Sequence, residues 1–469
     1  MSVRIAVIGA GPGGYAAAFH AADAGMHVTL IDAEPNPGGV CTFRGCIPSK
    51  ALLHAAKVLD EARHADAFGV TFGKPAIDLA RLRDWKDGVV RKQTGGLGLL
   101  AKARKVSFVQ GNASLADGKT LSVATSSGEQ RVEADYIIIA TGSRPSPVPG
   151  VSIDSPKVLD STTALELPDV PNRLLVVGGG YIGLELGTVY AALGSKVTVV
   201  EMTDGLLPGA DRDLAAVVAK RMETTCESIL LETKVTGVVD DKKGLSVTFE
   251  GKNAPTGGQT FDRVLVAVGR RPNSNIPGLD KTRVRVNQRG YIEVDGQRRT
   301  AELTIFAIGD VVGEPMLAHK ASHEARVAVE AIHGRPAVFE PRAIPAVVFT
   351  DPELAWAGLT EAEAKRQDRS VEVAKFPWAA SGRARTLDRQ DGLTKLIIDP
   401  ETERILGVGI VVSGAGELIA EGTLAIEMGA VAADLKLTIH PHPTLSESVM
   451  EAADVFFGES AHVYKPRKG

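Results

Sequence analysis

Short apolar runs alternate with a longer segment of helical character in the first part of the chain. Residues 5–8 form the first run, residues 15–24 form an alanine-rich helical segment, and residues 28–31 form the second run. Short apolar runs separated by a helix are typical of a βαβ unit whose strands lie parallel in a buried sheet. The sequence therefore predicts that the chain begins with a βαβ unit.

The same order returns in the middle of the chain. Residues 174–177 and 196–200 are apolar, and residues 184–193 between them are predicted to form a helix. Each unit is followed by a later apolar run that ends in a glycine, at residues 137–142 and 264–269. Because strands that alternate with helices build parallel sheets, we predict an α/β fold with two Rossmann-like dinucleotide-binding domains.

The turn after the first strand of each unit is rich in glycine. The repeated positions are Gly9, Gly11 and Gly14 in the first turn and Gly178, Gly180 and Gly183 in the second. Such a turn lets the backbone approach a pyrophosphate at the helix N-terminus and lets the helix pack close to the strand. Two nucleotide sites are therefore predicted.

An acidic residue ends the second strand of each unit, eighteen residues after the last glycine of the turn. It is Asp32 in the first unit and Glu201 in the second, and each is placed to accept hydrogen bonds from ribose hydroxyls. The matching acids favour two working sites over one site and an inactive copy. Glu201 stands where a site for a 2′-phosphate would carry arginine, so we predict NAD rather than NADP in the second site.

Composition narrows the classes of protein that fit. The chain has 469 residues, 44% hydrophobic and 23% charged, with a formal net charge of −4. This balance suits a globular protein of about three domains and excludes a strongly basic surface for nucleic acid or anionic lipid. Glycines at residues 11–14 interrupt the N-terminal apolar run, so we predict neither a signal peptide nor a membrane helix and expect a cytoplasmic protein.

Two of the three cysteines, Cys41 and Cys46, stand close together before a helical segment. In a regular helix, Cα atoms five positions apart are separated by about 8.6 Å, which exceeds the ~7 Å that a disulfide spans. A Cys41–Cys46 disulfide therefore requires a distorted turn, which Gly45 could supply, and a helix N-terminus would favour the thiolate. Two buried reduced cysteines are the alternative, and a zinc site is poorly supported without other cysteines nearby. Cys226 is expected to pack as a small apolar residue.

Six segments spread over the chain resemble those of one family. They are residues 9–14, 41–46, 140–143, 178–185, 307–310 and 440–447. On these segments the chain resembles the pyridine nucleotide–disulfide oxidoreductases, and among them the dihydrolipoamide dehydrogenases, over nearly its whole length. The resemblance implies an FAD-binding domain, an NAD-binding domain and a C-terminal α/β dimerisation domain.

The resemblance divides the chain into four predicted segments. They are residues 1–148 (FAD-binding), 149–272 (NAD-binding), 273–342 (completing the FAD-binding domain) and 343–469 (interface domain). Within the interface domain, residues 346–349 and 392–398 are predicted to be strands and residues 416–428 a helix.

The resemblance also assigns residues to each cofactor. For FAD they are Gly9, Gly11, Gly14, Asp32, Lys50, Ala113, Thr141, Gly142, Ser143, Asp310, Met316, Leu317, Ala318 and His319. For NAD they are Gly178, Gly180, Tyr181, Gly183, Glu185, Glu201, Val235 and Gly269. Lys50 and Glu185 match an ion pair beside the flavin, although a surface lysine and a helix-face glutamate are the simpler alternatives. Tyr181 matches an aromatic lid over the nicotinamide pocket.

The chemistry that the resemblance implies is thiol–disulfide exchange. Cys41 is the sulfur that a substrate thiolate attacks, and Cys46 faces the flavin. His442 is the base, oriented by Glu447 and serving the disulfide of the partner subunit, whereas His440 is expected to be a packed residue. The implied reaction oxidises protein-bound dihydrolipoamide to lipoamide and reduces NAD to NADH. The implied partners are a second copy of the chain and the lipoyl domain of an acyltransferase or the H protein of glycine cleavage.

The sequence departs from the family pattern between the cysteines, where Thr42, Phe43 and Arg44 replace the more common Leu-Asn-Val. Arg44 is hypothesised to lower a thiol pKa or to alter the mouth of the substrate site. The alternatives are a glutathione-type or mercuric reductase, a transhydrogenase and a catalytically idle scaffold. Glu201 argues against a glutathione-type reductase, which would use NADP. The absence of cysteines from residues 461–469 argues against a mercuric reductase. The presence of both redox cysteines, the histidine and its glutamate argues against the other two.

Overall fold

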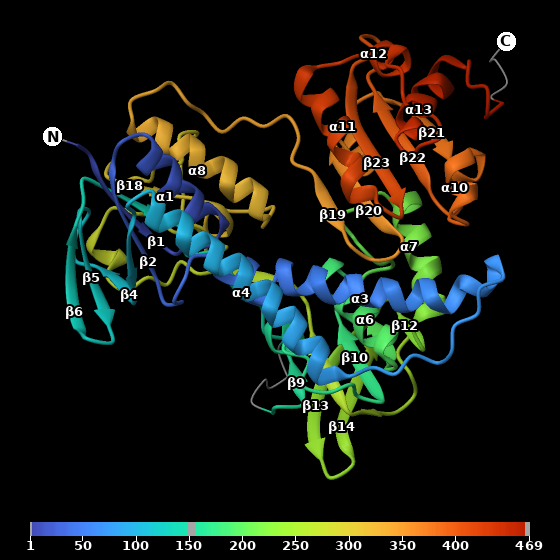
Figure 1. The fold of residues 1–469 in the computed structure, drawn as a ribbon, viewed down its shortest axis with the longest axis horizontal. Coiled ribbons are helices and arrows are strands. Elements are labelled where there is room, and N and C mark those ends of the chain that lie inside the picture. The colour runs from blue at the N-terminus through green and yellow to red at the C-terminus, as the bar shows by residue number, and fades with distance from the viewer. Residues whose placement is uncertain (1, 149–154, 465–469) are drawn as a thin grey trace.

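The structure is a computed structural model that describes residues 2–148 and 155–464. Figure 1 shows a first α/β domain on the left, a second at the lower centre and a C-terminal domain at the upper right. Helix α3 (Cys46–His64) runs between the second and the C-terminal domains. None of the helices in the described part of the chain is both long and apolar enough to cross a membrane.

A parallel five-stranded sheet forms the centre of the first domain. In spatial order its strands are β18 (Ile305–Ala307), β7 (Tyr136–Ile139), β1 (Arg4–Ile8), β2 (His27–Asp32) and β3 (Ser107–Gln110). Helices α1 (Pro12–Asp23) and α8 (Ala318–Ile332) cover one face, and the antiparallel sheet of β4 (Asn112–Leu115), β5 (Thr120–Thr125) and β6 (Gly128–Glu133) covers the other. Both faces are buried, which explains why the strands are apolar throughout.

The second domain repeats this topology. Its sheet has the order β12 (Ser228–Leu230), β11 (Lys196–Val200), β10 (Arg173–Val177), β16 (Arg263–Val266) and β9 (Val158–Leu159). Helices α5 (Ser161–Leu165), α6 (Tyr181–Leu193) and α7 (Arg212–Thr225) and the antiparallel sheet of β13 (Thr233–Asp241), β14 (Gly244–Gly251) and β15 (Gln259–Phe261) complete it. Both predicted βαβ units are confirmed. Helices α1 and α6 each begin three residues before the predicted start, because the last residues of the glycine turn already form the first helical turn.

A two-stranded ribbon joins the two nucleotide-type domains. Strand β8 (Ser143–Pro145) follows the first sheet, strand β17 (Arg270–Pro272) follows the second, and the two pair in antiparallel fashion. Arg271 lies opposite Arg144 in this register. The ribbon therefore brings residues from both domains to the same place.

The helix that carries the cysteines is broken between them. Helix α2 (Gly39–Arg44) ends at Gly45, whose φ of −144° and ψ of −115° are far from helical values, and α3 begins at Cys46. A Cβ atom at Gly45 would lie 2.9 Å from the carbonyl oxygen of Val40, so this close approach requires glycine. The predicted distortion at Gly45 is confirmed. Helix α4 (Leu79–Ala103), whose Asp78 caps its N-terminus, packs against both α2 and α3.

The C-terminal domain is an antiparallel sheet covered by helices. Its strands lie in the order β19 (Ala346–Val348), β20 (Glu353–Gly358), β23 (Ile405–Val412), β22 (Leu393–Ile398) and β21 (Glu372–Pro377). Its main helices are α11 (Ala415–Met428), α12 (Ala432–Leu437) and α13 (Glu447–Phe457), and the short helices are α9 (Glu361–Arg366) and α10 (Gly382–Thr386). The two predicted strands and the predicted helix are confirmed to within one residue.

An ionic cluster joins the C-terminal domain to the second domain. Lys395 is 1% exposed, and its Nζ lies 2.6 Å from Asp211 and 2.8 Å from both Asp213 and Glu361. Lys375 contacts the same carboxylates of Asp213 and Glu361 at 2.7 and 3.3 Å. The three acids are close enough to hold a metal ion, but the ammonium group of Lys395 lies among them, and together with that of Lys375 it offsets two of their three negative charges.

Candidate functional site

A cavity of about 390 Å³ opens where the parallel strands of the first sheet end. Residues that follow β1, β2, β7 and β18 line one side of it, α2 and the start of α3 line another, and α6 of the second domain closes it. The carboxyl ends of parallel strands are the usual ligand site of such sheets. The cavity therefore lies where a dinucleotide is expected.

The first glycine turn keeps the backbone accessible at one end of the cavity. Gly9 has a φ of +94°, and a Cβ atom there would lie 2.4 Å from the carbonyl oxygen of Ala140. A Cβ atom at Gly14 would lie 1.8 Å from the carbonyl oxygen of Gly9, so this glycine serves helix packing. Gly11 has open space beside it and caps α1 without a side-chain hydrogen bond. The N–H groups of the first turn of α1 therefore suit a pyrophosphate.

Asp32 stands beside this turn. Its carboxylate accepts hydrogen bonds from the backbone N–H of Ala10 at 2.6 Å and of Glu34 at 2.9 Å. Burial raises the pKa of Asp32, although the Ala10 N–H and the charge of Arg44 act in the opposite direction. The turn, the helix N-terminus and the acid together fit the adenosine and pyrophosphate parts of FAD.

Two cysteine thiols lie on the wall of the cavity. Their side chains share a hydrogen bond, and this bond is the main reason why the pKa of Cys46 falls to about 7. The charge of Lys50 lowers it further, against the effects of burial and of Glu185. The same hydrogen bond, together with burial, raises the pKa of Cys41. In the dithiol form the negative charge therefore resides on Cys46, and Cys41 keeps its proton.

Lys50 and Glu185 form an ion pair beneath the cysteines. The Nζ of Lys50 lies 2.8 Å from the Oε2 of Glu185, which also accepts from the hydroxyl of Ser49 at 3.1 Å. The Oε1 of Glu185 accepts from the backbone N–H of Phe349 at 3.0 Å, and the Lys50 ammonium lies 4.4 Å from the Phe349 ring centre. Glu185 is only 3% exposed. The alternatives of a surface lysine and a helix-face glutamate are therefore wrong.

This geometry predicts opposite effects of the two charges on Cys46. We expect Lys50→Met to raise the pKa of Cys46 above about 7 and Glu185→Gln to lower it, since the cation favours the thiolate and the anion opposes it. Alkylation of the reduced protein at pH 6 should slow roughly threefold or more in the first variant and accelerate in the second. Lys57→Met is the control, because that lysine lies two turns further along α3 and donates to Ser413. Equal alkylation rates in the wild type and the three variants would contradict the proposed influence of Lys50 and Glu185 on the pKa of Cys46.

The remaining residues assigned to FAD are divided between the cavity wall and its surroundings. On the wall lie Gly9, Gly11, Asp32, Lys50, Thr141, Gly142, Ser143, Asp310, Met316 and Ala318. Gly14, Ala113, Leu317 and His319 do not line it: Ala113 lies in β4, Leu317 caps α8 and the imidazole of His319 contacts the Pro345 carbonyl at 2.8 Å. Sequence reasoning missed Glu34, Ser49 and Arg270, which do line the cavity. Their partners are distant along the chain or across the turn, so no local pattern marks them.

The glycines of the second turn do not line this cavity, although Tyr181 between Gly180 and Gly183 does. A Cβ atom at Gly178 would lie 2.5 Å from the carbonyl oxygen of Ala267, whereas Gly180 has open space beside it. A Cβ atom at Gly183 would lie 2.1 Å from the carbonyl oxygen of Gly178. The carboxylate of Glu201 accepts from the backbone N–H of Gly179 at 2.8 Å. This arrangement repeats that of the first turn and fits a second dinucleotide.

Four residues assigned to NAD have different surroundings. Tyr181 and Glu185 line the first cavity, at the boundary between the two domains. Desolvation raises the pKa of Tyr181 to about 12, although the charge of Arg270 acts in the opposite direction. Gly269 has a φ of +116° at the end of β16. Val235 is buried in the core between two sheets, so its side chain is not available to a ligand.

The hypothesis that Arg44 lowers a thiol pKa is not supported by its position. Its guanidinium forms an ion pair with Glu34 at the adenosine end of the cavity, and the groups with the largest effects on the two cysteines are each other, Lys50 and Glu185. The hypothesis followed the position of Arg44 in the sequence, but the guanidinium pairs with Glu34.

We therefore expect Arg44→Ala to leave the pH profile of cysteine alkylation unshifted. Lys50→Met provides the positive control in the same assay, because its cation contributes to the low pKa of Cys46. A profile of Arg44→Ala displaced toward higher pH, as for Lys50→Met, would restore the original hypothesis.

His442 and Glu447 form a pair away from the cavity. The Nδ1 of His442 lies 2.8 Å from the Oε1 of Glu447, and the other carboxylate oxygen accepts from the Thr444 N–H at 2.7 Å. The His442 side chain is 75% exposed and does not line the cavity of its own chain. His440 contacts Glu421 and the Thr438 carbonyl and is 5% exposed, so it is a packed residue as predicted.

Comparisons with known proteins agree with this arrangement. The family described as "Pyridine nucleotide-disulphide oxidoreductase" matches residues 3–325, and its "dimerisation domain" matches residues 344–453. The chain is 50% identical to "Dihydrolipoyl dehydrogenase" of Vibrio cholerae over 98% of its length and 96% of the relative, and 46% identical to that of Geobacillus stearothermophilus over 97% of each. Among solved structures it is similar to LpdA of Mycobacterium tuberculosis, with a TM-score of 0.88 and 26% identity over 96% of this chain and 99% of that one.

Proposed function

The chain belongs to the pyridine nucleotide-disulphide oxidoreductases, and from that premise we propose that it oxidises protein-bound dihydrolipoamide to lipoamide and reduces NAD to NADH. Its cofactors are FAD and NAD, as in the dihydrolipoyl dehydrogenases to which it is similar. The observation that carries the proposal is the pair of thiols on the cavity wall, one of which has a pKa of about 7 beside the Lys50–Glu185 pair.

The two domains divide the cofactors between them. In the first domain, the turn at Gly9 and Gly11, Asp32 and the wall residues Ser143 and Asp310 hold FAD. In the second domain, the turn that begins at Gly178 holds NAD, together with Gly180, Gly183, Glu201 and Gly269. Bound FAD supplies the two-electron chemistry that connects the cysteine pair to NAD.

Disulfide exchange begins at Cys41. His442 of the partner subunit takes a proton from one substrate thiol, and the resulting thiolate attacks the Sγ of Cys41 in the Cys41–Cys46 disulfide. The bond between the cysteines breaks, and Cys46 leaves as a thiolate. The second substrate thiol then attacks the substrate sulfur bound to Cys41, so that the substrate closes to its cyclic disulfide. Cys41 leaves with a proton, and the substrate has lost two electrons and two protons.

The electrostatics of the site favour this order. A thiol of low pKa is the better leaving group, and the pKa of Cys46 is about 7 whereas that of Cys41 is raised. Attack at Cys41 therefore expels the more stable thiolate. The negative charge that results lies near the ammonium group of Lys50, which stabilises the thiolate.

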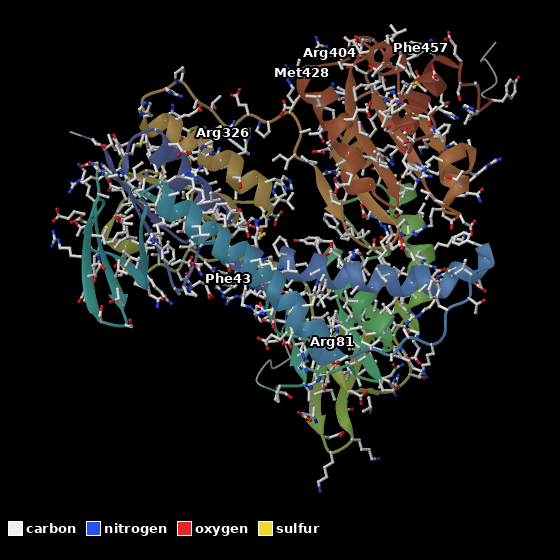
Figure 2. All side chains as sticks on the ribbon, viewed as in Figure 1. Phe43, Arg81, Arg326, Arg404, Met428 and Phe457 are labelled. Carbon is white, nitrogen blue, oxygen red and sulfur yellow. The ribbon has the colours of Figure 1, made fainter. Side chains whose placement is uncertain are left out.

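A homodimer completes the site. Leu424, Met428, Leu437 and Ile439 expose large apolar side chains in the dimerisation domain, and Ile439 is 94% exposed. Figure 2 labels Met428 at the outer edge of this domain. Exposed apolar side chains of this kind suit contact with a second copy of the chain. His442 lies three residues after Ile439 in the sequence, close to these exposed side chains along the chain.

The substrate is a lipoyl group carried by a partner protein, either the lipoyl domain of an acyltransferase or the H protein of glycine cleavage.

Anaerobic titration of the purified protein with dihydrolipoamide, followed by NAD, tests the proposal. We expect a long-wavelength absorption band from the Cys46 thiolate against the oxidised flavin, and then NADH formation. A protein that NADH reduces but dihydrolipoamide does not would keep the cofactors and overturn the substrate. A protein that purifies without flavin and binds none would overturn the whole proposal.

A further inference from the structure

Arg270 belongs to the second domain but contacts a residue of the first. It opens β17, directly after the second sheet, and pairs through its backbone with Pro145 of β8. Its Nε donates to the hydroxyl of Ser143 at 2.7 Å, and its Nη2 donates to the carbonyl oxygen of the same residue at 2.7 Å. One guanidinium thus holds both the side chain and the backbone of Ser143.

Ser143 in turn contacts Asp310. Its hydroxyl donates to the Oδ2 of Asp310 at 2.5 Å, and the serine is only 3% exposed. A serine hydroxyl has a single proton. Because Arg270 donates to this oxygen, the hydroxyl must donate its own proton to Asp310. The direction of both hydrogen bonds, from Arg270 to Ser143 and from Ser143 to Asp310, is therefore fixed. The carboxylate is thereby held in one orientation on the cavity wall.

The same guanidinium lies close to the boundary between the two nucleotide sites. Arg270, Ser143, Asp310 and Tyr181 all line the cavity, and the charges of both Arg270 and Asp310 act on the hydroxyl of Tyr181. The adjacent Arg271 has the opposite surroundings, since it is exposed and does not line the cavity. The two neighbouring arginines therefore form a matched pair of test and control positions.

We propose that Arg270 is a positioning residue for FAD: acting through Ser143 and Asp310, it makes the FAD affinity of the first domain depend on a side chain of the second. This inference rests on the proposed function only in that it takes the first cavity to be the FAD site. Removal of the guanidinium takes two hydrogen bonds from buried Ser143 and frees the Ser143 hydroxyl and the Asp310 carboxylate to adopt other orientations. Orienting these groups again when FAD binds then lowers the FAD affinity.

The test is a titration of the flavin-free protein with FAD, in which binding is measured as the change in flavin fluorescence. We expect the dissociation constant to rise about tenfold or more in Arg270→Met, less in Arg270→Lys, which keeps the charge but lacks the planar fork, and not at all in Arg271→Met. In a double-mutant cycle, Arg270→Met should add little to Ser143→Ala, because both break the same chain of hydrogen bonds.

Thermal unfolding of the flavin-free variants distinguishes positioning from a general loss of structure. The midpoints of Arg270→Met and Arg270→Lys should fall by no more than roughly 5 °C below that of the flavin-free wild type, as the loss of one or two hydrogen bonds implies, while FAD binding weakens. Unchanged FAD affinity in Arg270→Met, or additive effects with Ser143→Ala, would overturn the inference. If Arg270→Met does not fold, wild-type affinity in Arg270→Lys would overturn it equally. Absence of FAD binding by the wild type is a separate result, which overturns the proposed function instead.

Discussion

Cys41→Ala is expected to lower the rate of dihydrolipoamide oxidation by NAD at least about a thousandfold, since the sulfur that accepts the substrate thiolate is gone. The variant should still bind FAD, because the cysteine contributes one small part of a wall built from many segments of the chain. It should also retain electron transfer from NADH to an artificial dye, because that reaction does not need the cysteine pair. Steady-state assays with dihydrolipoamide and with the dye separate the two activities.

The same variant is expected to change the acidity of Cys46. The hydrogen bond from Cys41 is the largest cause of its low pKa, so removing the donor should raise the pKa from about 7 toward the ordinary value for a thiol. The thiolate population, and with it the long-wavelength band against the flavin, should then be lost at pH 7 and return at higher pH. A spectrophotometric pH titration of Cys41→Ala and of the reduced wild type measures this shift.

Cys226→Ser provides the matched control. Burial raises the pKa of Cys226 to about 12, and the residue packs into the core of the second domain. Its replacement should leave both the dihydrolipoamide activity and the titration of Cys46 unchanged. Substantial dihydrolipoamide activity in Cys41→Ala would show that the substrate thiolate attacks elsewhere, and an unshifted titration would show that Cys41 is not the donor to Cys46.

Elements governed by nearest neighbours could be predicted from the sequence. The strand of residues 5–8 and the glycine turn after it are local, because apolar runs and close backbone approaches are encoded in adjacent positions. The break at Gly45 was also predictable, since a regular helix holds two cysteines five positions apart too far from each other for a bond. The two glycine turns were located in this way, whereas other residues of the cavity wall were assigned through the family resemblance.

Contacts between distant positions could not be predicted from local patterns, and the Lys50–Glu185 pair was expected only through the family resemblance. Ser143 and Arg270 are 127 positions apart, and nothing near either residue indicates the other. The hypothesis that Arg44 lowers a thiol pKa found no support for a related reason, because it rested on proximity to the cysteines in the sequence alone. The guanidinium of Arg44 pairs instead with Glu34, which lies on the segment after β2. Side-chain direction is set by the fold around a residue and not by its sequence neighbours.

The place at which His442 acts is also not encoded by its sequence neighbours, because the family resemblance assigns it to the disulfide of the partner subunit. Within one chain the imidazole is exposed and contacts Glu447, but it does not line the cavity that holds the two cysteines. Although burial opposes ionisation, the Thr444 N–H and His442 hold the pKa of Glu447 below its ordinary value. The carboxylate therefore stays ionised at neutral pH and accepts a hydrogen bond from the imidazole Nδ1, which leaves Nε2 free to act as the base.

His442→Gln is expected to lower turnover by about 10²- to 10⁴-fold, the usual contribution of a general base. Glu447→Gln should lower it less, because the amide can still orient the ring but no longer stabilises the imidazolium ion. His440→Gln is the control, since that ring is packed against Glu421 and does not reach a substrate. The initial rate with dihydrolipoamide measures all three, and the dye reductase rate should stay near that of the wild type in each.

A mixed dimer tests whether His442 acts across the interface. Co-expression of a Cys41→Ala chain and a His442→Gln chain, each with its own affinity tag, yields heterodimers in which one site combines an intact cysteine pair with an intact base from the other subunit. If the base comes from the partner, this site is complete, and the heterodimer should recover about half of the wild-type rate although each parent homodimer is nearly inactive. If the base served its own chain, every site in the heterodimer would lack one group, and no rate would return. Recovery therefore identifies the dimer as the catalytic unit, because only the pairing of two defective chains can assemble one working site.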